Sequence, residues 1–264
     1  MVNGTRSSDT DEVVVSRKKS GPVKKVVLLV IWLVLLGGLI FWIKTVGGNG
    51  GEIAAGPVKP TPAPTLNVAM LEAKWPQIIA NAAAPPRGTA GTPYTIAEFG
   101  DFQCPQCGKA YPVLEGMLQK YPSQVNLLFL HRPFPQLHQW AVPSGQASEI
   151  AGLSGHFWPM YDILYTHQDK LEPGYYGDYA SQAGLDKAKF QAAFDAGQGQ
   201  PQIKAASAFA DSLGVQTTPT VLLRNNATKK ITIFVGTIGT KNADGTPQYP
   251  GINTLAANPP WAGQ

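Results

Sequence analysis

Cysteine is scarce in this sequence, with only two among 264 residues, which excludes a small scaffold held by several disulfide bonds. Charged residues are also few, at 14%. The 28 Gly and 23 Pro residues make up about a fifth of the chain, below the roughly 25–30% typical of low-complexity disorder. No internal repeat is visible. The chain, 44% hydrophobic, is long enough to bury one sizeable core.

The net charge of +4 is concentrated near the N-terminus. Residues 1–25 contain six Lys or Arg and three Asp or Glu, so they carry +3 and leave only +1 for the rest of the chain. A nearly neutral body has no basic surface with which to bind a phosphate backbone. The sequence therefore predicts no nucleic-acid partner.

A single long apolar run follows this basic tail. Residues 26–43 contain no charge, and lysines flank them on both sides. As a helix the run would be about 27 Å long, close to the thickness of a bilayer's hydrocarbon core. The preceding basic residues predict a cytoplasmic N-terminus and a body on the other side of the membrane. We therefore interpret residues 26–43 as a transmembrane anchor.

Two other interpretations of this run remain open. A cleaved signal peptide is one, although its apolar part usually spans about 7–15 residues and no A-x-A site follows directly. A buried core helix is the other, and the absence of a polar face argues against it. The rest of the chain divides by composition into a Gly/Pro-rich linker at 44–66, a folded domain at 67–257 and a C-terminal tail at 258–264.

The folded domain alternates strand and helix signals. Its order is strand, helix, strand, a long helical block and a pair of strands, which predicts an α/β sheet with a parallel start and an antiparallel finish. The helical block is too long for a crossover connection, so we expect a helical subdomain inserted at about 137–213. Strands are expected at 94–99, 125–130, 220–224 and 231–235, and helices after Cys104, within 139–213 and at 252–257.

Both cysteines lie in one motif, Cys104-Pro105-Gln106-Cys107, between a predicted strand and a predicted helix. A cysteine at the N-cap of a helix faces unpaired N–H groups and the positive end of the helix dipole, which favour a thiolate. This predicts that Cys104 is the nucleophile. Cys107 lies one turn later and can resolve a mixed disulfide, so the pair can shuttle two electrons by thiol–disulfide exchange.

Other uses of two cysteines fit the sequence less well. Half of a zinc site would need further ligands, but there is no second C-x-x-C, and His131 and His138 lack zinc-finger spacing. A Cys–His hydrolase is weakly supported, since nothing picks out a base or its orienting group. Two inert cysteines remain possible at this spacing. The four histidines are expected to be surface or packing residues, and no metal site is predicted.

These residues resemble a known family. The stretch 96–107, IAEFGDFQCPQC, resembles the active-site segment of DsbA-like thioredoxin-fold oxidoreductases. Residues 217–220, TTPT, resemble the family's cis-proline loop, while 131–135 and 155–165 resemble the strand end and a helix of its inserted domain. The similarity covers about 67–257. It implies a thioredoxin-like α/β fold with an inserted helical subdomain, here preceded by one N-terminal transmembrane helix.

The resemblance also implies roles for single residues. Pro219 is expected to be cis and to face the disulfide, with Thr218 offering backbone hydrogen bonds to an extended substrate. Glu98 takes the place of a buried acid that assists proton transfer around Cys107; the alternative is a carboxylate at the strand end that faces solvent. Pro112 corresponds to a structural proline that kinks the active-site helix.

One position departs from the best-known oxidising member, which has histidine where this chain has Gln106. Glutamine carries no positive charge to stabilise a thiolate, so we expect a potential less extreme than that of the strongest periplasmic oxidant. The sequence still predicts a redox pair, Cys104–Cys107, with Pro105 and Gln106 completing the active-site motif. No cofactor beyond this disulfide is expected.

Taken together, the sequence predicts a membrane-anchored thiol–disulfide oxidoreductase whose catalytic domain lies outside the bacterial cytoplasmic membrane, in the periplasm. Its expected partners are exported proteins with cysteines and a membrane redox partner that recycles it. Its expected reaction is the oxidation of client dithiols. A reductase or isomerase of the same fold, and a redox-inactive binding or chaperone module, are the alternatives.

Overall fold

The computed structural model describes residues 65–242 and 244–262. The expected basic tail, the expected transmembrane anchor, nearly all of the expected linker and the last two residues of the expected C-terminal tail lie outside them. Within the described residues, no helix has both the length and the apolar content needed to cross a membrane. The described residues all belong to one compact unit.

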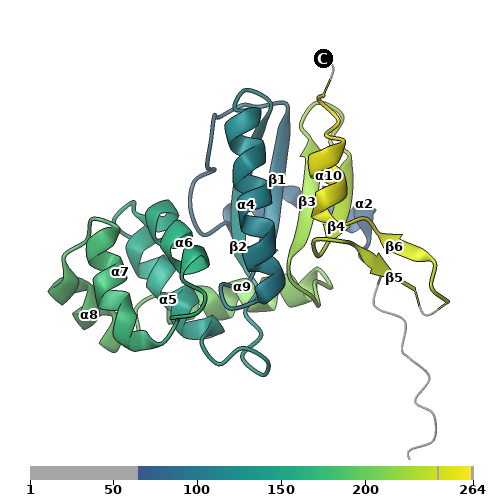
Figure 1. Cartoon of the computed structure of the whole chain (residues 1–264). Coiled ribbons are helices and arrows are strands. Elements are labelled where there is room, and N and C mark those ends of the chain that lie inside the picture. The colour runs from purple at the N-terminus through teal and green to yellow at the C-terminus, as the bar shows by residue number, and fades with distance from the viewer. Residues whose placement is uncertain (1–64, 243, 263–264) are drawn as a thin grey trace, which may run out of the picture. The chain divides into compact units, whose positions relative to one another are not determined.

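A four-stranded sheet forms the centre of this unit, with the strand order β2-β1-β3-β4 (Figure 1). Strand β1 pairs in parallel with β2, while β3 runs antiparallel to both β1 and β4. This mixed sheet, parallel at its start and antiparallel at its end, is the one that the sequence predicts. The strands are β1 (Tyr94–Gly100), β2 (Val125–His131), β3 (Thr220–Asn225) and β4 (Ile231–Val235).

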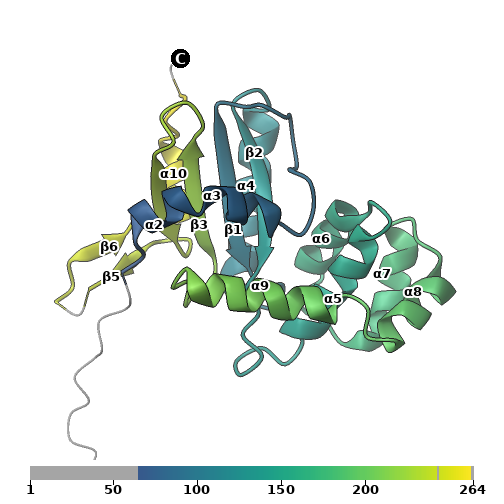
Figure 2. The ribbon, with the colours of Figure 1, turned by 180° about the vertical axis from the view of Figure 1, so that it is seen from behind.

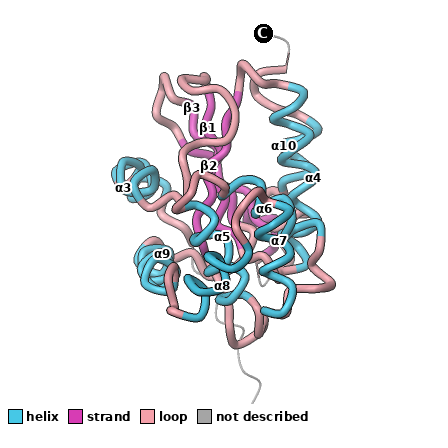
Figure 3. The backbone as a smooth tube through the Cα atoms, turned by 90° about the vertical axis from the view of Figure 1, so that its left-hand side faces the viewer, coloured by secondary structure: helices cyan, strands magenta, loops and turns pink. Residues whose placement is uncertain are grey.

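Alternate strand residues enter two separate apolar cores, one on each face of the sheet. On β1, Ile96 packs into the core under α4 (Pro105–Lys120) and α10 (Ile252–Ala257). Its neighbours Ala97 and Phe99 enter the opposite core. Figure 3 shows α4 and α10 on one side of the strands, with α3 and α9 on the other. The helices of the second core are α2 (Val68–Ala73), α3 (Trp75–Ala80) and α9 (Gln200–Ser212).

A block of helices separates β2 from β3 in the chain, as the sequence predicts. The block ends with α9, which crosses below the strands and leads back to the sheet (Figure 2). The helical block packs on α4 through a shared apolar core that contains Phe157, Tyr161 and Leu164 of α6. The remaining helices are α5 (Ala141–Gly152), α6 (Phe157–Thr166), η1 (Pro173–Tyr175), α7 (Tyr176–Gln182) and α8 (Lys187–Asp195).

A small hairpin after β4 is not anticipated by the sequence. Strands β5 (Thr240–Lys241) and β6 (Pro247–Tyr249) pair antiparallel with an irregular register. A side chain at Gly251 would collide with the backbone of Thr237 and Gly239. Glycine is therefore required where these two backbone segments meet.

Candidate active site

The two cysteines lie where the sequence predicts, at the start of α4. Cys104 is the N-cap of this helix and Pro105 is its first residue, a position where proline's missing N–H costs no hydrogen bond. The Cys104 N–H donates to the Asp101 carbonyl at 3.0 Å, and the Gly108 N–H donates to the Cys104 carbonyl at 3.1 Å. Both cysteines are free thiols in this structure. Both cysteines are buried, with Cys104 6% and Cys107 0% exposed, so only Cys104 at the helix N-terminus keeps any contact with solvent.

The environments of the two thiols differ strongly. The pKa of Cys104 is lowered to about 5, and the interaction with Cys107 is the main cause. Burial opposes this lowering, while Thr218 and the backbone N–H groups of Cys107 and Gln106 contribute further to it. Burial, followed by the interaction with Cys104, raises the pKa of Cys107 well above its ordinary value. Cys104 is thus a thiolate at neutral pH while Cys107 keeps its proton.

The loop before β3 faces the first cysteine across a sequence separation of more than a hundred residues. Its Thr218–Pro219 peptide bond is cis, as the resemblance implies. The Thr218 carbonyl oxygen lies 3.4 Å from Cys104 Sγ and accepts a hydrogen bond from it when the thiol is protonated. The Pro219 carbonyl accepts from the Gly236 N–H at 2.8 Å, which ties the loop to the end of β4. The structure therefore brings together three of the residues that the sequence singles out.

Glu98 is completely buried on β1, which excludes the alternative of a solvent-facing carboxylate. Two tyrosines of the inserted helix α6 donate to it: Tyr161 to Oε2 at 3.0 Å and Tyr165 to Oε1 at 3.4 Å. Burial raises the pKa of Glu98 to about 8, although both hydrogen bonds oppose the rise and the charges of Glu115 and Cys104 favour it. At neutral pH this carboxyl group is therefore mostly protonated.

The inserted domain also fixes the active-site turn directly. Gln168, just after α6, donates through Nε2 to the carbonyls of Phe102 at 2.6 Å and Cys104 at 3.0 Å. A Cβ at Gly108 would collide with the Gln168 side chain, and one at Gly100 would come within 2.8 Å of the Tyr165 hydroxyl. Gly108 makes room for a side chain from the insertion, and Gly100 makes room for the Phe129 ring of β2 as well as for Tyr165. The sheet and the insertion therefore build one site.

Replacing Tyr161 with phenylalanine is expected to raise the pKa of Glu98 by about 1–2, because a hydrogen bond to a charged group contributes about 1.5–3 kcal/mol. The ring, which packs in the core, stays in place. A pH titration of the Glu98 carboxyl by NMR or infrared spectroscopy measures the change. Tyr179→Phe is the matched control, since the Tyr179 hydroxyl donates to the Lys170 carbonyl instead. An unchanged titration in Tyr161→Phe would contradict the assigned hydrogen bond.

Sequence reasoning misses a histidine beside the redox pair. A pocket of about 230 Å³ is lined by Cys104, Phe134, Leu137, His138 and residues 216–218. His138 Nδ1 lies 2.8 Å from Oδ2 of the buried Asp101. Asp101 and His138 are separated by 37 positions in the chain, which explains why the sequence gives no sign of the pair. Among the described residues, no group of three or more His, Cys, Asp or Glu side chains is arranged to hold a metal ion.

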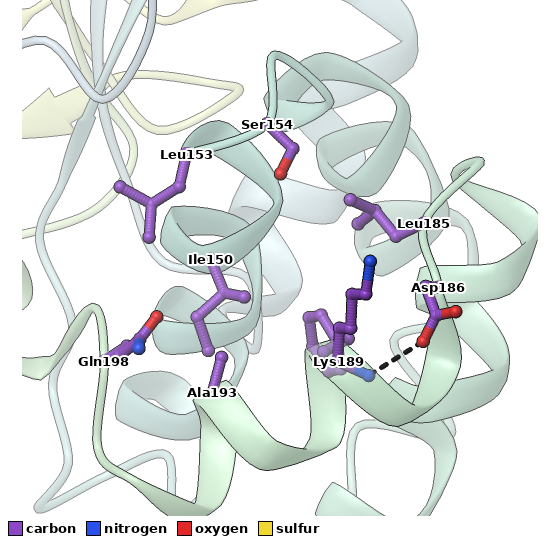
Figure 4. Close-up of a pocket in the computed structure, with 9 residues that line it drawn as sticks. Ile150, Leu153, Ser154, Leu185, Asp186, Lys189, Ala193 and Gln198 are labelled. Atoms are coloured by element: carbon purple, nitrogen blue, oxygen red, sulfur yellow. Dashed lines mark hydrogen bonds between the residues drawn. The ribbon is translucent and has the colours of Figure 1, made fainter.

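A second pocket, of about 180 Å³, lies entirely within the inserted domain (Figure 4). Ile150, Leu153 and Phe190 are among its apolar lining residues. The hydrogen bond from the Lys189 N–H to Asp186 Oδ1 at 2.8 Å, between two other lining residues, is the N-cap contact of α8. None of the redox residues lines this pocket, so we place the candidate active site at Cys104.

Comparisons with known proteins support this placement. Residues 81–233, more than half of the chain, match the family model described as thioredoxin. The range includes both cysteines, Glu98, the cis-proline loop and the whole helical insertion. It also includes β1, β2, β3 and part of β4.

Solved structures share the fold at low sequence identity. Wolbachia pipientis alpha-DsbA2, a thiol-disulfide exchange protein, is 14% identical with a TM-score of 0.54, and the match covers 72% of this chain and 94% of that protein. Proteus mirabilis ScsC is 19% identical with a TM-score of 0.53 and coverages of 81% and 86%. Oxidised BdbD from Bacillus subtilis is 22% identical with a TM-score of 0.50 and coverages of 58% and 84%. These three similarities establish the fold.

Curated relatives match only part of the chain. The Na(+)/H(+) antiporter NhaA 3 of Salinispora tropica is 36% identical over 134 residues, which are 51% of this chain and 20% of the antiporter. NhaA 1 of Mycolicibacterium gilvum is 36% identical over 104 residues, or 39% and 17%. The chain therefore spans about a fifth of the length of the curated relatives that it matches.

Proposed function

The chain belongs to the thioredoxin family and has the fold of its DsbA-like members, and from this premise we propose that it is a thiol–disulfide oxidoreductase that oxidises the dithiols of exported proteins. One arrangement carries the proposal: Cys104 is the N-cap of α4 and lies 3.4 Å from the cis-proline loop, while Cys107 is completely buried. The pKa of Cys104, lowered to about 5, and that of Cys107, raised above its ordinary value, agree with this arrangement. Such a pair has one ready nucleophile and one protonated resolving thiol.

The proposed reaction begins with the Cys104–Cys107 disulfide. A client thiolate attacks Cys104 Sγ, and the S–S bond to Cys107 breaks. Cys107 receives the proton of Glu98, which is available because the pKa of Glu98 is about 8. A second client thiolate then attacks the client sulfur of the mixed disulfide and releases Cys104 as a thiolate. Two electrons have passed from the client to the pair, and a membrane redox partner would remove them.

Stabilisation of the Cys104 thiolate supports the oxidising direction. A site that stabilises the reduced form makes the disulfide a stronger oxidant, since potential and thiolate stability belong to one thermodynamic cycle. The oxidised full-length chain should therefore form disulfides in a reduced, unfolded client protein faster than its reduced form cleaves the disulfides of insulin. Rapid insulin reduction with slow client oxidation would favour a reductase or isomerase. No exchange in either assay would favour a binding or chaperone module.

Replacing Gln106 with histidine is expected to raise the reduction potential by about 30 mV or more, since a histidine that lowers the thiol pKa by one favours reduction by about 1.4 kcal/mol. Gln106 is exposed on the first turn of α4, where its Oε1 accepts from Thr237 Oγ1 at 2.8 Å. Thr237→Val, which removes only that hydrogen bond, is the control. Equilibration with glutathione measures both potentials. A lower potential in Gln106→His would contradict the role assigned to this position.

We also propose that the domain acts outside the cytoplasm, tethered through residues 26–43. The uncharged run in the sequence and its basic flank support this location. Protease added to spheroplasts, which lack the outer layers of the cell envelope, should release the folded domain by cutting within residues 44–66. Full protection of the domain from the protease would contradict an extracytoplasmic position.

A further inference from the structure

A histidine stands beside the redox pair without a part in the proposed exchange. His138 lines the pocket that contains Cys104 and Thr218, and its side chain is 19% exposed. Leu137, which is 76% exposed, contributes to the same pocket. A client cysteine must enter here to reach Cys104 Sγ. The exposed edge of the His138 ring therefore lies on the path of an incoming client thiol.

The orientation of the His138 ring is fixed by a buried carboxylate. Asp101 is 2% exposed, and its Oδ1 accepts from the Gln103 N–H at 2.9 Å. Its Oδ2 accepts from the Phe134 N–H at 3.0 Å and lies 2.8 Å from His138 Nδ1. Because the carboxylate can only accept, the proton of the neutral imidazole is held on Nδ1. The Nε2 atom is then unprotonated, and its lone pair can accept a proton.

The other charged groups near this loop are already engaged. Arg132 donates to Asp211 Oδ1 at 2.6 Å and to the Val215 carbonyl at 2.8 Å, and its guanidinium stacks 4.5 Å from the Phe134 ring. Within the described part of the chain, no hydrogen bond to His138 Nε2 is present. Asp101 and Cys104 are therefore the titratable groups that share this site with the imidazole.

We propose that His138 is the general base that removes the proton from the client thiol, with Asp101 as its positioning residue. This role rests on the proposed function and supplies the step that precedes exchange. The client S–H proton passes to Nε2, and the client sulfur then forms a bond to Cys104 Sγ. The Cys104–Cys107 bond breaks, and its electron pair leaves on Cys107. The histidine then returns its proton to water.

The test compares two thiols that differ in how much they need a base. In the disulfide form of the full-length chain, 2-mercaptoethanol attacks Cys104 as a thiol that is almost entirely protonated at pH 8. Trifluoroethanethiol attacks the same sulfur but is mostly ionised at that pH. Loss of the Cys104–Cys107 disulfide is followed by acid quenching and alkylation. His138→Asn retains a donor at the place of Nδ1 and removes Nε2.

We expect His138→Asn to slow the reaction with 2-mercaptoethanol about tenfold, a modest effect for a general base, and to leave the trifluoroethanethiol rate within about twofold. The second thiol also reports whether the variant is folded. His167→Asn is the control, because His167 Nδ1 contacts the Ile163 carbonyl at 2.9 Å. It should change neither rate.

Equal slowing with both thiols would mean that His138 only holds the loop, and no slowing with either would mean that it has no part; both results overturn the inference. A wild-type disulfide that reacts with neither thiol would overturn the inference together with the proposed function. A wild-type disulfide that reacts with both thiols but does not oxidise a dithiol client would overturn the proposed function alone.

Discussion

Replacing Cys107 with alanine will trap disulfide-containing client proteins on Cys104 as stable mixed disulfides, whereas Cys104→Ala will trap none and abolish exchange. In Cys107→Ala the Cys104 thiolate attacks a client disulfide and releases one client thiol, and no second active-site thiol remains to resolve the product. In the unchanged chain the pKa of Cys104 is about 5, so almost all of it is thiolate at pH 7, compared with about 3% of a free thiol of pKa about 8.5. The substitution removes the largest contribution to this lowering, the interaction with Cys107, and keeps those of Thr218 and of the backbone. Non-reducing electrophoresis of each variant, isolated after acid quenching, measures the trapped species.

Cys107 cannot replace Cys104 in this role, because burial keeps its thiol protonated and out of reach of a client. The double variant Cys104→Ala/Cys107→Ala is the control for non-covalent association. Equal trapping by the two single variants would contradict the assigned roles.

Replacing Glu98 with glutamine is expected to remove a strong pH dependence of folding stability. The pKa of Glu98 is about 8 in the folded chain, against an ordinary value of 4.5. Between these values the folded chain retains a proton that the unfolded chain has lost. The stabilisation is therefore complete below about pH 4.5 and is lost as the pH rises through 8. Each pH unit in this window costs about 1.4 kcal/mol, or up to about 5 kcal/mol in all.

The Cys104 thiolate changes folding stability with pH in the opposite direction to Glu98. The measurement therefore needs a chain without this thiolate. The lowered pKa of Cys104 gives stability that is present above pH 9 and is lost as the pH falls toward 5. Urea unfolding from pH 5 to pH 8 should therefore be compared in the Cys104→Ala/Cys107→Ala chain with and without Glu98→Gln. Between pH 5 and pH 8, the free energy of unfolding should fall by several kcal/mol more in the chain with Glu98 than in the chain with Glu98→Gln. Parallel pH profiles would show that Glu98 is not held protonated.

Much of the fold can be predicted from local sequence patterns. The apolar runs that form β1 to β4 are each bounded by turn residues, and Cys104-Pro105 predicts both the N-cap and the first residue of α4. The hairpin β5–β6 cannot be predicted from the sequence, because its strands are two and three residues long and too short to show an alternating pattern. It depends on the close approach of Gly239 and Gly251, which no periodic pattern reveals.

The site is only partly predictable for a similar reason. Cys104 and Cys107 are only three positions apart in the chain, so their spacing alone indicates their chemistry. The partners of Glu98 lie more than sixty residues away, on a helix of the insertion. His138 reaches the pocket only because the loop after β2 folds back onto Asp101. Contacts of this kind follow from tertiary packing and leave no spacing signal.

The equilibrium reduction potential of the Cys104–Cys107 pair, measured against glutathione at several pH values, tests the account most directly. A stabilised thiolate predicts a potential between about −270 and −120 mV at pH 7. Because Cys104 ionises near pH 5 and Cys107 stays protonated, reduction takes up one proton above that pH. The potential should then fall by about 30 mV per pH unit between pH 6 and 8. A potential at or below about −270 mV, with a slope of about 60 mV per unit, would contradict the account.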